Sequence, residues 1–226
     1  MKPLLPLLLV VAGAVTITAL RQQSRAELGL PAPAFDVVRP ATAAEQTAYF
    51  AGGCFWGVEA VFEHIKGVTS SVSGYAGGSA PNPTYDAVSA GETGHAEMVR
   101  VTFDPSKVTY GQLLQVFFSV AHDPTELNRQ GPDVGTQYRS MVLFTTAEQK
   151  QVVEAYIAQL TKAGAYPRPI VTQVETYSVF HVAEDYHQNY LEAHRMQPYI
   201  IFNDLPKLAG LKEEFSSLYR SGVSGK

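Results

Sequence analysis

A chain of 226 residues that is 46% hydrophobic and 17% charged is long and apolar enough to bury the core of one globular domain. Its formal net charge of −4, without any run of Lys or Arg, excludes the basic surface that binds nucleic acids. The only cysteine is Cys54, which excludes an internal disulfide and a cysteine-rich structural zinc site.

The first predicted element is a targeting segment. Lys2 precedes an uncharged apolar run from Pro3 to Leu20, and Arg21 ends it. A basic start before an apolar run is typical of a secretory signal peptide, and Ser24–Ala26 fits a cleavage site. The run is also just long enough for an uncleaved membrane anchor. We therefore expect residues 1–26 to be a signal peptide or an N-terminal anchor, and the protein to work in the periplasm or another extracytoplasmic space.

The next four segments follow from residue type and spacing. Residues 27–46 are rich in Pro and Ala and predict a linker, and residues 47–53 predict a short strand that ends in a glycine turn. From Cys54 the apolar positions recur at helical spacing, which predicts an amphipathic helix ending near Gly67. Residues 74–94 are rich in Gly, Pro and Ser and predict a long loop, which in a compact domain is usually functional.

Residues 95–103 alternate strictly and predict a strand with Glu97 on the same face as Val99 and Val101. Strands and helices interleave along the chain without a clean parallel repeat. This favours the α+β class, with a mixed or antiparallel sheet and helices packed against it. The remaining predicted elements are helices over 113–121, 183–194 and 204–219, strands over 136–144 and 170–177, and a helix from Thr146 to about Lys162 with a Thr146–Gln149 capping box.

The setting of Cys54 suggests a reactive thiol. Gly52 and Gly53 have no side chain to cap the first helical turn, so its free N–H groups would face a thiolate and lower the pKa of the thiol. The alternative is a small buried hydrophobic residue, which free cysteines often are. Neighbouring residues of a helix point about 100° apart, so Phe55 and Trp56 cannot both face the core. One of them should form an apolar wall near the thiol.

Glu97 is the second unusual residue. If its strand face is the core, burial should raise the pKa of the carboxyl and keep it protonated near neutral pH, as a general acid needs. The alternative is a residue at the end of the sheet with its carboxylate in water. The six histidines show no metal-ligand spacing, so we expect no bound metal or cofactor.

Five stretches of this sequence together resemble the A-type peptide methionine sulfoxide reductases. The resemblance runs in the family's order from about Thr47 to Phe215, which implies a catalytic domain over 47–215 and a tail over 216–226. It also implies the family's fold, an α+β two-layer sandwich with a mixed, largely antiparallel sheet flanked by helices around a ferredoxin-like core. The five stretches are Gly52–Glu59, Gly74–Gly78, Asn82–Pro105, His122–Ser140 and Ala183–Leu191.

The resemblance implies a reaction and a site. Methionine sulfoxide, free or in proteins and as the S epimer, would be reduced to methionine, which repairs oxidative damage and leaves a sulfenic acid on the enzyme. The implied roles are Cys54 as the nucleophile that attacks the sulfoxide sulfur, Glu97 as the proton donor to its oxygen, Phe55 and Trp56 as the pocket for the S-methyl group, Tyr85 and Tyr138 as hydrogen-bond partners of the oxygen, and Asp133 as part of the substrate site.

One departure from the family concerns recycling. Many members carry one or two further cysteines near the C-terminus, but here residues 197–204 contain none, and Ile200 stands about where such a cysteine often follows a tyrosine. The chain therefore resembles the single-cysteine subtype, which needs an external thiol. Thioredoxin, a glutaredoxin-like protein or a small thiol would serve, and we expect the enzyme to be a monomer.

Two other functions stay open from the residues alone. A cysteine hydrolase or acyl transferase would need a histidine base, for example His95 or His187. A non-catalytic module would use the apolar wall to bind an exposed methionyl or other apolar side chain. Only a reductase consumes thiol while it converts a sulfoxide to a thioether.

Overall fold

A computed structural model describes residues 29–37 and 44–222. The chain separates into two units, Met1–Leu30 and Pro31–Lys226, and the fold below belongs to the second. The predicted targeting segment, 1–26, lies outside the described residues. Within the described residues, no helix combines the length and the apolar character that a membrane span requires.

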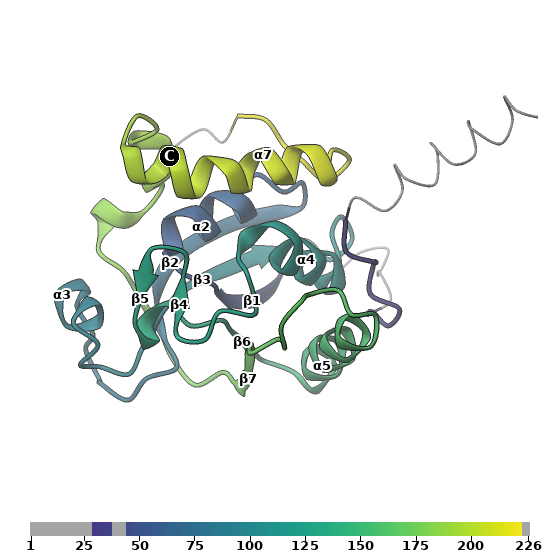
Figure 1. Cartoon of the computed structure of the whole chain (residues 1–226), viewed down its shortest axis with the longest axis horizontal. Helices are drawn as coiled ribbons and strands as arrows, with labels where there is room; N and C mark the ends of the chain where they lie inside the picture. Colours follow the sequence, from purple (N-terminus) through teal and green to yellow (C-terminus); the bar gives the residue numbers. More distant parts are fainter. Residues whose placement is uncertain (1–28, 38–43, 223–226) are drawn as a thin grey trace, which may run out of the picture. The chain divides into compact units, whose positions relative to one another are not determined.

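The second unit is built on a mixed six-stranded sheet (Figure 1). All neighbouring strands pair antiparallel except β6 and β7, which are parallel. This confirms the predicted α+β class. In spatial order the strands are β7 (Gln173–Thr176), β6 (Met141–Phe144), β1 (Gln46–Ala51), β3 (Ala96–Phe103), β2 (Val68–Ala76) and β8 (Phe180–Val182).

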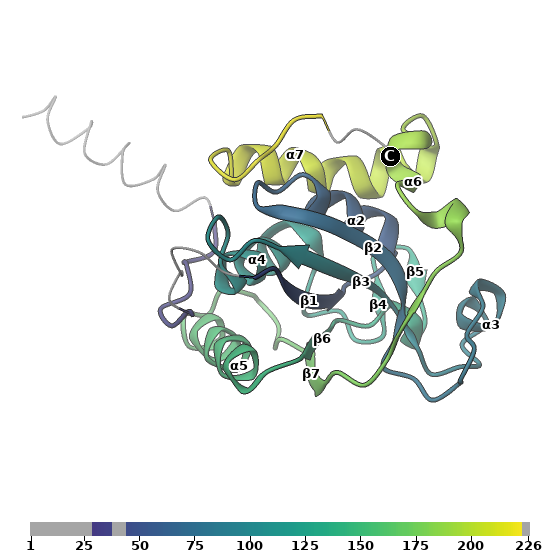
Figure 2. The ribbon, with the colours of Figure 1, turned by 180° about the vertical axis from the view of Figure 1, so that it is seen from behind.

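Helices lie against this sheet, and a two-stranded hairpin stands beside it. Figures 1 and 2 show α7 lying along α2, and α5 packs against α4, β6 and β7. The helices are α2 (Phe55–Glu63), α3 (Tyr85–Ser89), α4 (Tyr110–Val116) with its π-helical continuation η1 (Phe117–Ala121), α5 (Ala147–Lys162), α6 (Tyr190–Ala193) and α7 (Leu205–Glu214), which follows the π-helical η4 (Ile200–Asp204). The hairpin is β4 (Arg129–Gln130) and β5 (Asp133–Val134), and the 3-10 turns are η2 (Thr136–Tyr138) and η3 (Asp185–His187).

One face of the sheet is buried under helices, and part of the other face is buried as well. On the helical face the ring of Phe50 stacks on Phe62 at 4.8 Å and lies 5.0 Å from Phe117. On the other face a smaller cluster that includes Met98 is covered by Tyr177 and Phe180. The alternation of β3 is thus confirmed for its inward face, while part of the opposite face is buried as well because the chain before β8 crosses it.

The structure differs from the prediction in three segments. The sequence predicts no strand at 68–76, where β2 pairs with β3 over its length and with β8 near its end. Its three serines and Gly74 are poor strand formers and hide the strand pattern of the segment, so its pairing partners help to set this strand. The strand predicted over 136–144 begins only at Met141. The helix predicted over 183–194 is interrupted by Asn189, whose φ is +54°.

The N-terminus of α5 shows half of the predicted capping box. The Thr146 side chain accepts from the N–H of Gln149 at 3.2 Å. The Gln149 side chain instead accepts from the N–H of Thr145 at 2.9 Å and donates to the carbonyl of Thr47 at 2.9 Å. This glutamine therefore ties α5 to β1, a tertiary contact that competes with the local cap.

The segment predicted as a linker is bound to the domain in part of its described length. The carbonyl of Pro31 accepts from the Tyr156 hydroxyl at 2.9 Å. Asp36 accepts from the N–H of Gly111 at 2.9 Å and from the Thr109 hydroxyl, so its carboxylate lies at the start of α4.

Candidate active site

Cys54 is the N-cap residue of α2, at the junction between β1 and the helix. Its side chain is buried. The two preceding glycines are required for close packing. Gly53 has φ +89°, and a Cβ on it would lie 2.6 Å from the Gln130 side chain. A Cβ on Gly52 would lie 2.8 Å from the His122 ring. Any side chain at either position would push the thiol-bearing turn away from its neighbours.

Glu97 reaches the same turn from β3. Its Oε2 accepts a hydrogen bond from the N–H of Phe55 at 3.0 Å, so the carboxyl caps the start of α2 beside Cys54. Burial, chiefly, raises the pKa of Glu97 to about 8, and the charges of Asp133 and Asp204 add to this. The Phe55 N–H opposes the shift. The prediction that burial keeps Glu97 protonated near neutral pH is confirmed.

The predicted lowering of the Cys54 pKa is wrong. Burial raises the pKa of the thiol well above its ordinary value, and the carboxylates of Glu97 and Asp204 raise it further. The N–H of Trp56 and the ammonium of Lys207 lower it by less. The helix start does act on the thiol as expected. However, one of its N–H groups, that of Phe55, is already bound to the Glu97 carboxyl, a contact that no local sequence signal predicts.

Trp56 forms the aromatic wall of the site. Its ring stacks on Tyr190 with 3.8 Å between centroids and meets Tyr199 edge-on at 6.0 Å. Its Nε1–H donates to Nδ1 of His187 at 3.1 Å. Phe55 is buried and lies 5.0 Å from the His187 ring. Phe55 is therefore in the core and Trp56 is partly exposed, so the two aromatics do not both face the core, as predicted, and one imidazole contacts both of them.

The two predicted tyrosines lie in short helical elements: Tyr85 is the first residue of α3 and Tyr138 is the last residue of η2. Burial raises the pKa values of Tyr85 and Tyr138, and the charges of Glu97 and Cys54 raise both further, so both hydroxyls lie within the electrostatic influence of the thiol and the carboxyl. Asp133, on β5, also raises the pKa of Tyr138. The structure therefore brings together the predicted nucleophile, acid, tyrosines and aspartate.

Tyr199 is a site residue that the sequence prediction missed. Its hydroxyl donates to Asp133 Oδ2, and burial followed by the charge of Cys54 raises its pKa. It directly precedes Ile200, in the stretch already singled out for lacking a cysteine. This position, directly before Ile200, is the sequence feature that could have identified Tyr199 as a site residue.

Buried polar contacts hold the loops that carry these groups. Arg139 Nη1 donates to the carbonyl of Thr136 at 2.8 Å, and Nη2 donates to those of Gly77 and Gly94 at 3.1 Å each. This guanidinium joins the turn that carries Tyr138 to both ends of the loop that carries Tyr85. Glu184 accepts from the N–H of Tyr85 at 3.0 Å and fixes the start of α3.

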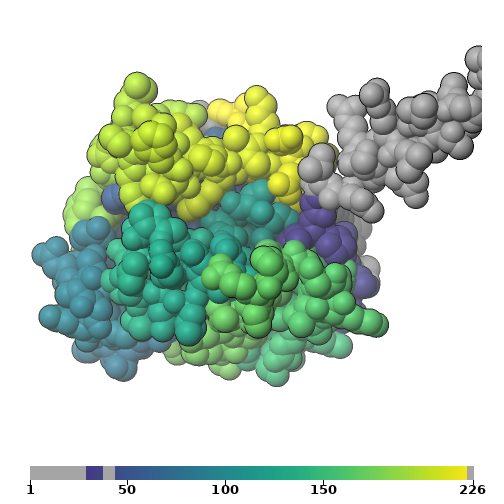
Figure 3. Space-filling view, in the orientation of Figure 1, coloured from purple at the N-terminus to yellow at the C-terminus, as the bar shows by residue number. Residues whose placement is uncertain are grey.

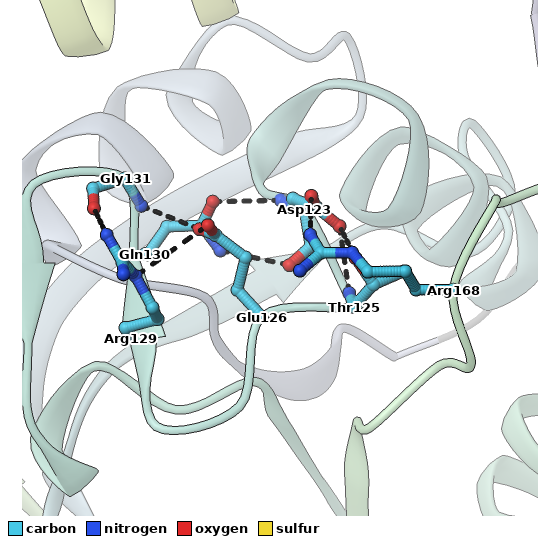
Figure 4. A network of polar contacts seen from close by, with 7 residues as sticks. All are labelled: Asp123, Thr125, Glu126, Arg129, Gln130, Gly131 and Arg168. Atoms are coloured by element: carbon cyan, nitrogen blue, oxygen red, sulfur yellow. Dashed lines mark hydrogen bonds and ion pairs between the residues drawn. The ribbon is translucent and has the colours of Figure 1, made fainter.

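A second network fixes the hairpin that carries Asp133 (Figure 4). The Gln130 side chain accepts from the N–H of Asp123 and donates to its carbonyl, each at 3.0 Å. The Asp123 carboxylate accepts from Thr125 and pairs with Arg168 at 3.1 Å. Because Gln130 also packs on Gly53, the hairpin and the thiol-bearing turn are positioned by one side chain.

The two histidines considered as bases are committed elsewhere. His95 Nδ1 accepts from the N–H of Gly78 at 3.1 Å, and its Nε2 lies 2.9 Å from the carbonyl of Ala80. His187 Nδ1 accepts from Trp56, and its Nε2 has no hydrogen-bond partner and lies 4.0 Å from a carboxylate oxygen of Glu184. A thiol–imidazole pair of the hydrolase type is not formed by either ring. No cluster of metal-ligating side chains occurs in the described part of the chain.

A thiol, a protonated carboxyl and an aromatic wall are the groups that a cysteine-dependent reductase of an organic oxide needs. Residues 46–218 match the family model described as peptide methionine sulfoxide reductase. The chain is 59% identical over 174 residues to peptide methionine sulfoxide reductase MsrA 2 of Mesorhizobium japonicum, covering 77% of this chain and 89% of that protein. It is 51% identical over 178 residues to MsrA of Deinococcus radiodurans, covering 79% and 86%.

Solved structures agree with these sequence matches. Methionine sulfoxide reductase A of Corynebacterium diphtheriae superposes with a TM-score of 0.60 at 37% identity, covering 71% of this chain and 80% of that one. Reduced Mxr1 of Saccharomyces cerevisiae superposes with a TM-score of 0.61 at 30% identity, covering 73% and 92%. The chain belongs to the peptide methionine sulfoxide reductase family. It is a peptide-methionine (S)-S-oxide reductase of the MsrA type with a single cysteine.

Proposed function

We propose that Cys54 carries out the reduction as a nucleophile and that Glu97 supplies the proton. The Cys54 thiolate attacks the sulfoxide sulfur while protonated Glu97 gives its proton to the sulfoxide oxygen. The attack forms a bond between the two sulfurs, and the sulfur–oxygen bond breaks as the protonated oxygen leaves as hydroxide. The hydroxide then attacks the Cys54 sulfur and breaks the sulfur–sulfur bond, so methionine leaves and Cys54 is left as a sulfenic acid. The substrate sulfur gains the two electrons that the cysteine sulfur loses.

One observation carries this assignment: the Glu97 carboxyl lies 3.0 Å from the N–H of Phe55, next to Cys54, with a pKa of about 8. A carboxylate there would repel a neighbouring thiolate, so the two groups are best charged one at a time. Protonated Glu97 is neutral and removes one of the causes that raise the pKa of the thiol. The same protonation state therefore favours both the nucleophile and the acid.

The other predicted residues would bind the substrate. The wall formed by Trp56 and the buried Phe55 suits the S-methyl group. The charges of the thiol and the acid act on both tyrosines, and Asp133 acts on Tyr138, which supports a common site for the sulfoxide oxygen and the substrate backbone. In this assignment Tyr85 and Tyr138 donate hydrogen bonds to the oxygen, and Asp133, held by Tyr199, binds the rest of the substrate.

Recycling in this proposal uses an external thiol. With Cys54 as the only cysteine, no second thiol in the chain can attack the sulfenic acid. A first thiol forms a mixed disulfide with Cys54 and releases water, and a second thiol frees the enzyme as its own disulfide forms. Thioredoxin, a glutaredoxin-like protein and a small thiol are the candidate reductants.

We propose the ferredoxin-like two-layer sandwich as the finer description of the fold. It is supported by the order β6–β1–β3–β2, in which α2 connects β1 to β2 and α4 lies between β3 and β6. An experimental structure with α2 and α4 on different faces of these strands would overturn it.

Export remains a proposal that rests on the apolar run from Pro3 to Leu20. Fractionation of cells and the mass of the mature protein test it: loss of about 26 residues indicates a cleaved signal, and an intact chain in the membrane fraction indicates an anchor. Light scattering of the purified enzyme tests the expected monomer.

The proposed nucleophile is tested by Cys54→Ser. We expect no conversion of methyl p-tolyl sulfoxide in the presence of thiol, with an unchanged circular dichroism spectrum, because the substitution is nearly isosteric. Wild-type enzyme given sulfoxide without reductant should release one thioether per chain and then be labelled by dimedone at Cys54. Turnover by Cys54→Ser would refute the assignment.

A further inference from the structure

The chain between β8 and α6 contacts two parts of the candidate site. It contains the 3-10 turn η3, which begins directly after Glu184. Figure 2 shows this stretch rising past α3 to α6, and in Figure 3 light-green atoms of the later part of the chain lie against the blue atoms around α3, at the left of the molecule. The hydrogen bond between Glu184 and the start of α3 thus joins residues that are 99 positions apart.

The Glu184 carboxylate uses both oxygens on groups outside its own turn. Its Oε1 accepts from the N–H of Tyr85 at 3.0 Å, and its Oε2 accepts from the hydroxyl of Tyr75 at 2.8 Å. Tyr75 is fully buried in β2, and its ring lies 5.8 Å from that of Phe55. Glu184 gives η3 no side-chain cap, although it directly precedes that turn. Its carboxylate is therefore a tertiary connection between η3, α3 and β2.

His187 connects the same carboxylate to the aromatic wall. An indole nitrogen only donates, so His187 Nδ1, which lies 3.1 Å from Trp56 Nε1, must accept and carries no proton. A neutral imidazole then carries its proton on Nε2. Among the described residues this nitrogen is buried without a hydrogen-bond partner, and Glu184 Oε2 lies 4.0 Å from it. The charge of the carboxylate favours a proton on Nε2, which is the tautomer that can accept from Trp56.

The His187 ring also lies between the two proposed halves of the substrate pocket. It is 4.4 Å from the ring of Tyr85 and 5.9 Å from that of Trp56, measured between centroids. Its side chain is only 2% exposed, so a small rotation of the ring would collide with one of these neighbours. A group that fixes the orientation of this imidazole therefore fixes the spacing between the tyrosine and the indole.

We propose that Glu184 is a positioning residue for the reduction: its carboxylate holds Tyr85 by the backbone N–H and, through His187, holds the indole of Trp56. It joins the group proposed to bind the sulfoxide oxygen to the wall proposed to bind the S-methyl group. Both sides of the pocket then keep one spacing, which matches the fixed distance between oxygen and methyl in a sulfoxide. This inference rests on the roles proposed above for Tyr85 and Trp56.

The first readout follows the indole without using the reaction. Trp56 is the only tryptophan of the chain, so intrinsic fluorescence excited at the indole band reports on this residue alone. We expect Glu184→Ala to increase the quenching of this fluorescence by acrylamide, because the indole loses its fixed acceptor and moves more freely. His187→Ala should have the same effect. The double variant should do no more than His187→Ala, since Glu184 acts on the indole through His187.

The second readout follows the substrate. The rate of a single turnover without thiol, measured against the concentration of methyl p-tolyl sulfoxide, gives an apparent dissociation constant. Glu184→Ala should raise this constant by about 3- to 10-fold, the effect of losing one hydrogen bond in the pocket. Alkylation of Cys54 by iodoacetamide should keep its wild-type rate, because the thiol-bearing turn is untouched. A variant that had merely lost its fold would change alkylation as well.

Two further variants sharpen the test. Glu184→Gln is nearly isosteric and takes the place of Glu184→Ala if the latter does not fold. Its amide has one acceptor oxygen, so it cannot accept from Tyr85 and also face the N–H of His187, and at least one readout should change. The matched control is Glu192→Gln on α6. Glu192 is 28% exposed and pairs with Arg195, so this variant should behave as the wild type in both readouts.

Three results would overturn the inference. The first is wild-type quenching with a wild-type dissociation constant in Glu184→Ala. The second is changed quenching with unchanged binding, because Glu184 would then hold the indole without serving the pocket. The third is a changed alkylation rate, because the effect would then extend to the thiol-bearing turn. Cys54→Ser would still be inactive in each case if the proposed nucleophile is right, so the two proposals fail separately.

Discussion

Glu97 and Glu59 are two buried carboxyls with the same pKa, about 8. Glu97 contacts α2 from β3, and Glu59 is a residue of α2. Glu97 caps the start of the helix beside the thiol. Glu59 lies within the helix, where it accepts from the Ser73 hydroxyl at 2.9 Å and from the N–H of Asn189 at 3.3 Å. Burial is the first cause of both shifts. The two carboxyls differ in their neighbours. Glu97 lies beside the thiol and acts on two tyrosines, whereas Glu59 accepts hydrogen bonds from two groups outside the site.

A raised pKa therefore shows only that a carboxyl is desolvated, and it does not by itself identify a catalytic acid. The experiments below separate the two roles, starting with the change that should have the largest effect.

Glu97→Gln should lower kcat by about 10²- to 10⁴-fold, because the amide cannot give a proton to the sulfoxide oxygen. The wild-type rate should fall as the pH rises through about 8, where Glu97 ionises, and the variant should lack this fall. Steady-state kinetics from pH 6 to 9 measure both effects. A variant as fast as the wild type at every pH would place the acid elsewhere and remove the difference between the two carboxyls.

Glu59→Gln should leave kcat within about two-fold and change how stability depends on pH. The folded-state pKa of Glu59 is raised above the usual 4.5 to about 8, so the native state binds more protons in this window. The free energy of unfolding must then fall as the pH rises from about 4.5 to 8. Without this carboxyl, the fall should be smaller by on the order of 2–3 kcal/mol. Urea unfolding at pH 5 and pH 8 measures it, and equal falls in both proteins would contradict the assigned role.

Ser73→Ala removes one donor to Glu59 while leaving the site around Cys54 intact. Losing a buried hydrogen bond to a carboxyl should lower the free energy of unfolding by about 1–2 kcal/mol. The effect should be larger at pH 8 than at pH 5, because the lost bond stabilises the ionised form. Unchanged stability at both pH values would show that the Ser73 hydroxyl is dispensable to the buried carboxyl.

Glu63→Gln should have the smallest effect. Burial and the charge of Glu192 raise the pKa of Glu63 to about 7, so above that pH the folded protein carries an ionised carboxyl that lowers its stability. The amide should therefore raise the free energy of unfolding at pH 8 by about 1 kcal/mol and change little at pH 5. Activity should not change. A loss of kcat in this variant would extend the active site further along α2 than its geometry indicates.

Much of the fold could be predicted because its signals are local. The spacing after Cys54, the alternation of β3 and the cap at Thr146 each depend on a few adjacent residues. β2 could not be predicted in this way, because its serine-rich sequence becomes a strand only between β3 and β8. The start of the strand at Met141 was also missed, since Arg139 holds the preceding residues in a turn through contacts with a distant loop.

The candidate site divides along the same line. The sequence by itself determined that a lone thiol follows a glycine turn at a helix start, that Glu97 faces inward, and which family the chain resembles. Only the tertiary structure decided that Glu97 caps the helix of Cys54, that Tyr199 holds Asp133, and that the pKa of the thiol rises. Local periodicity fixes which side chains face the core. Burial and charge, in contrast, depend on which distant segments meet there, and these set the pKa values on which the chemistry depends.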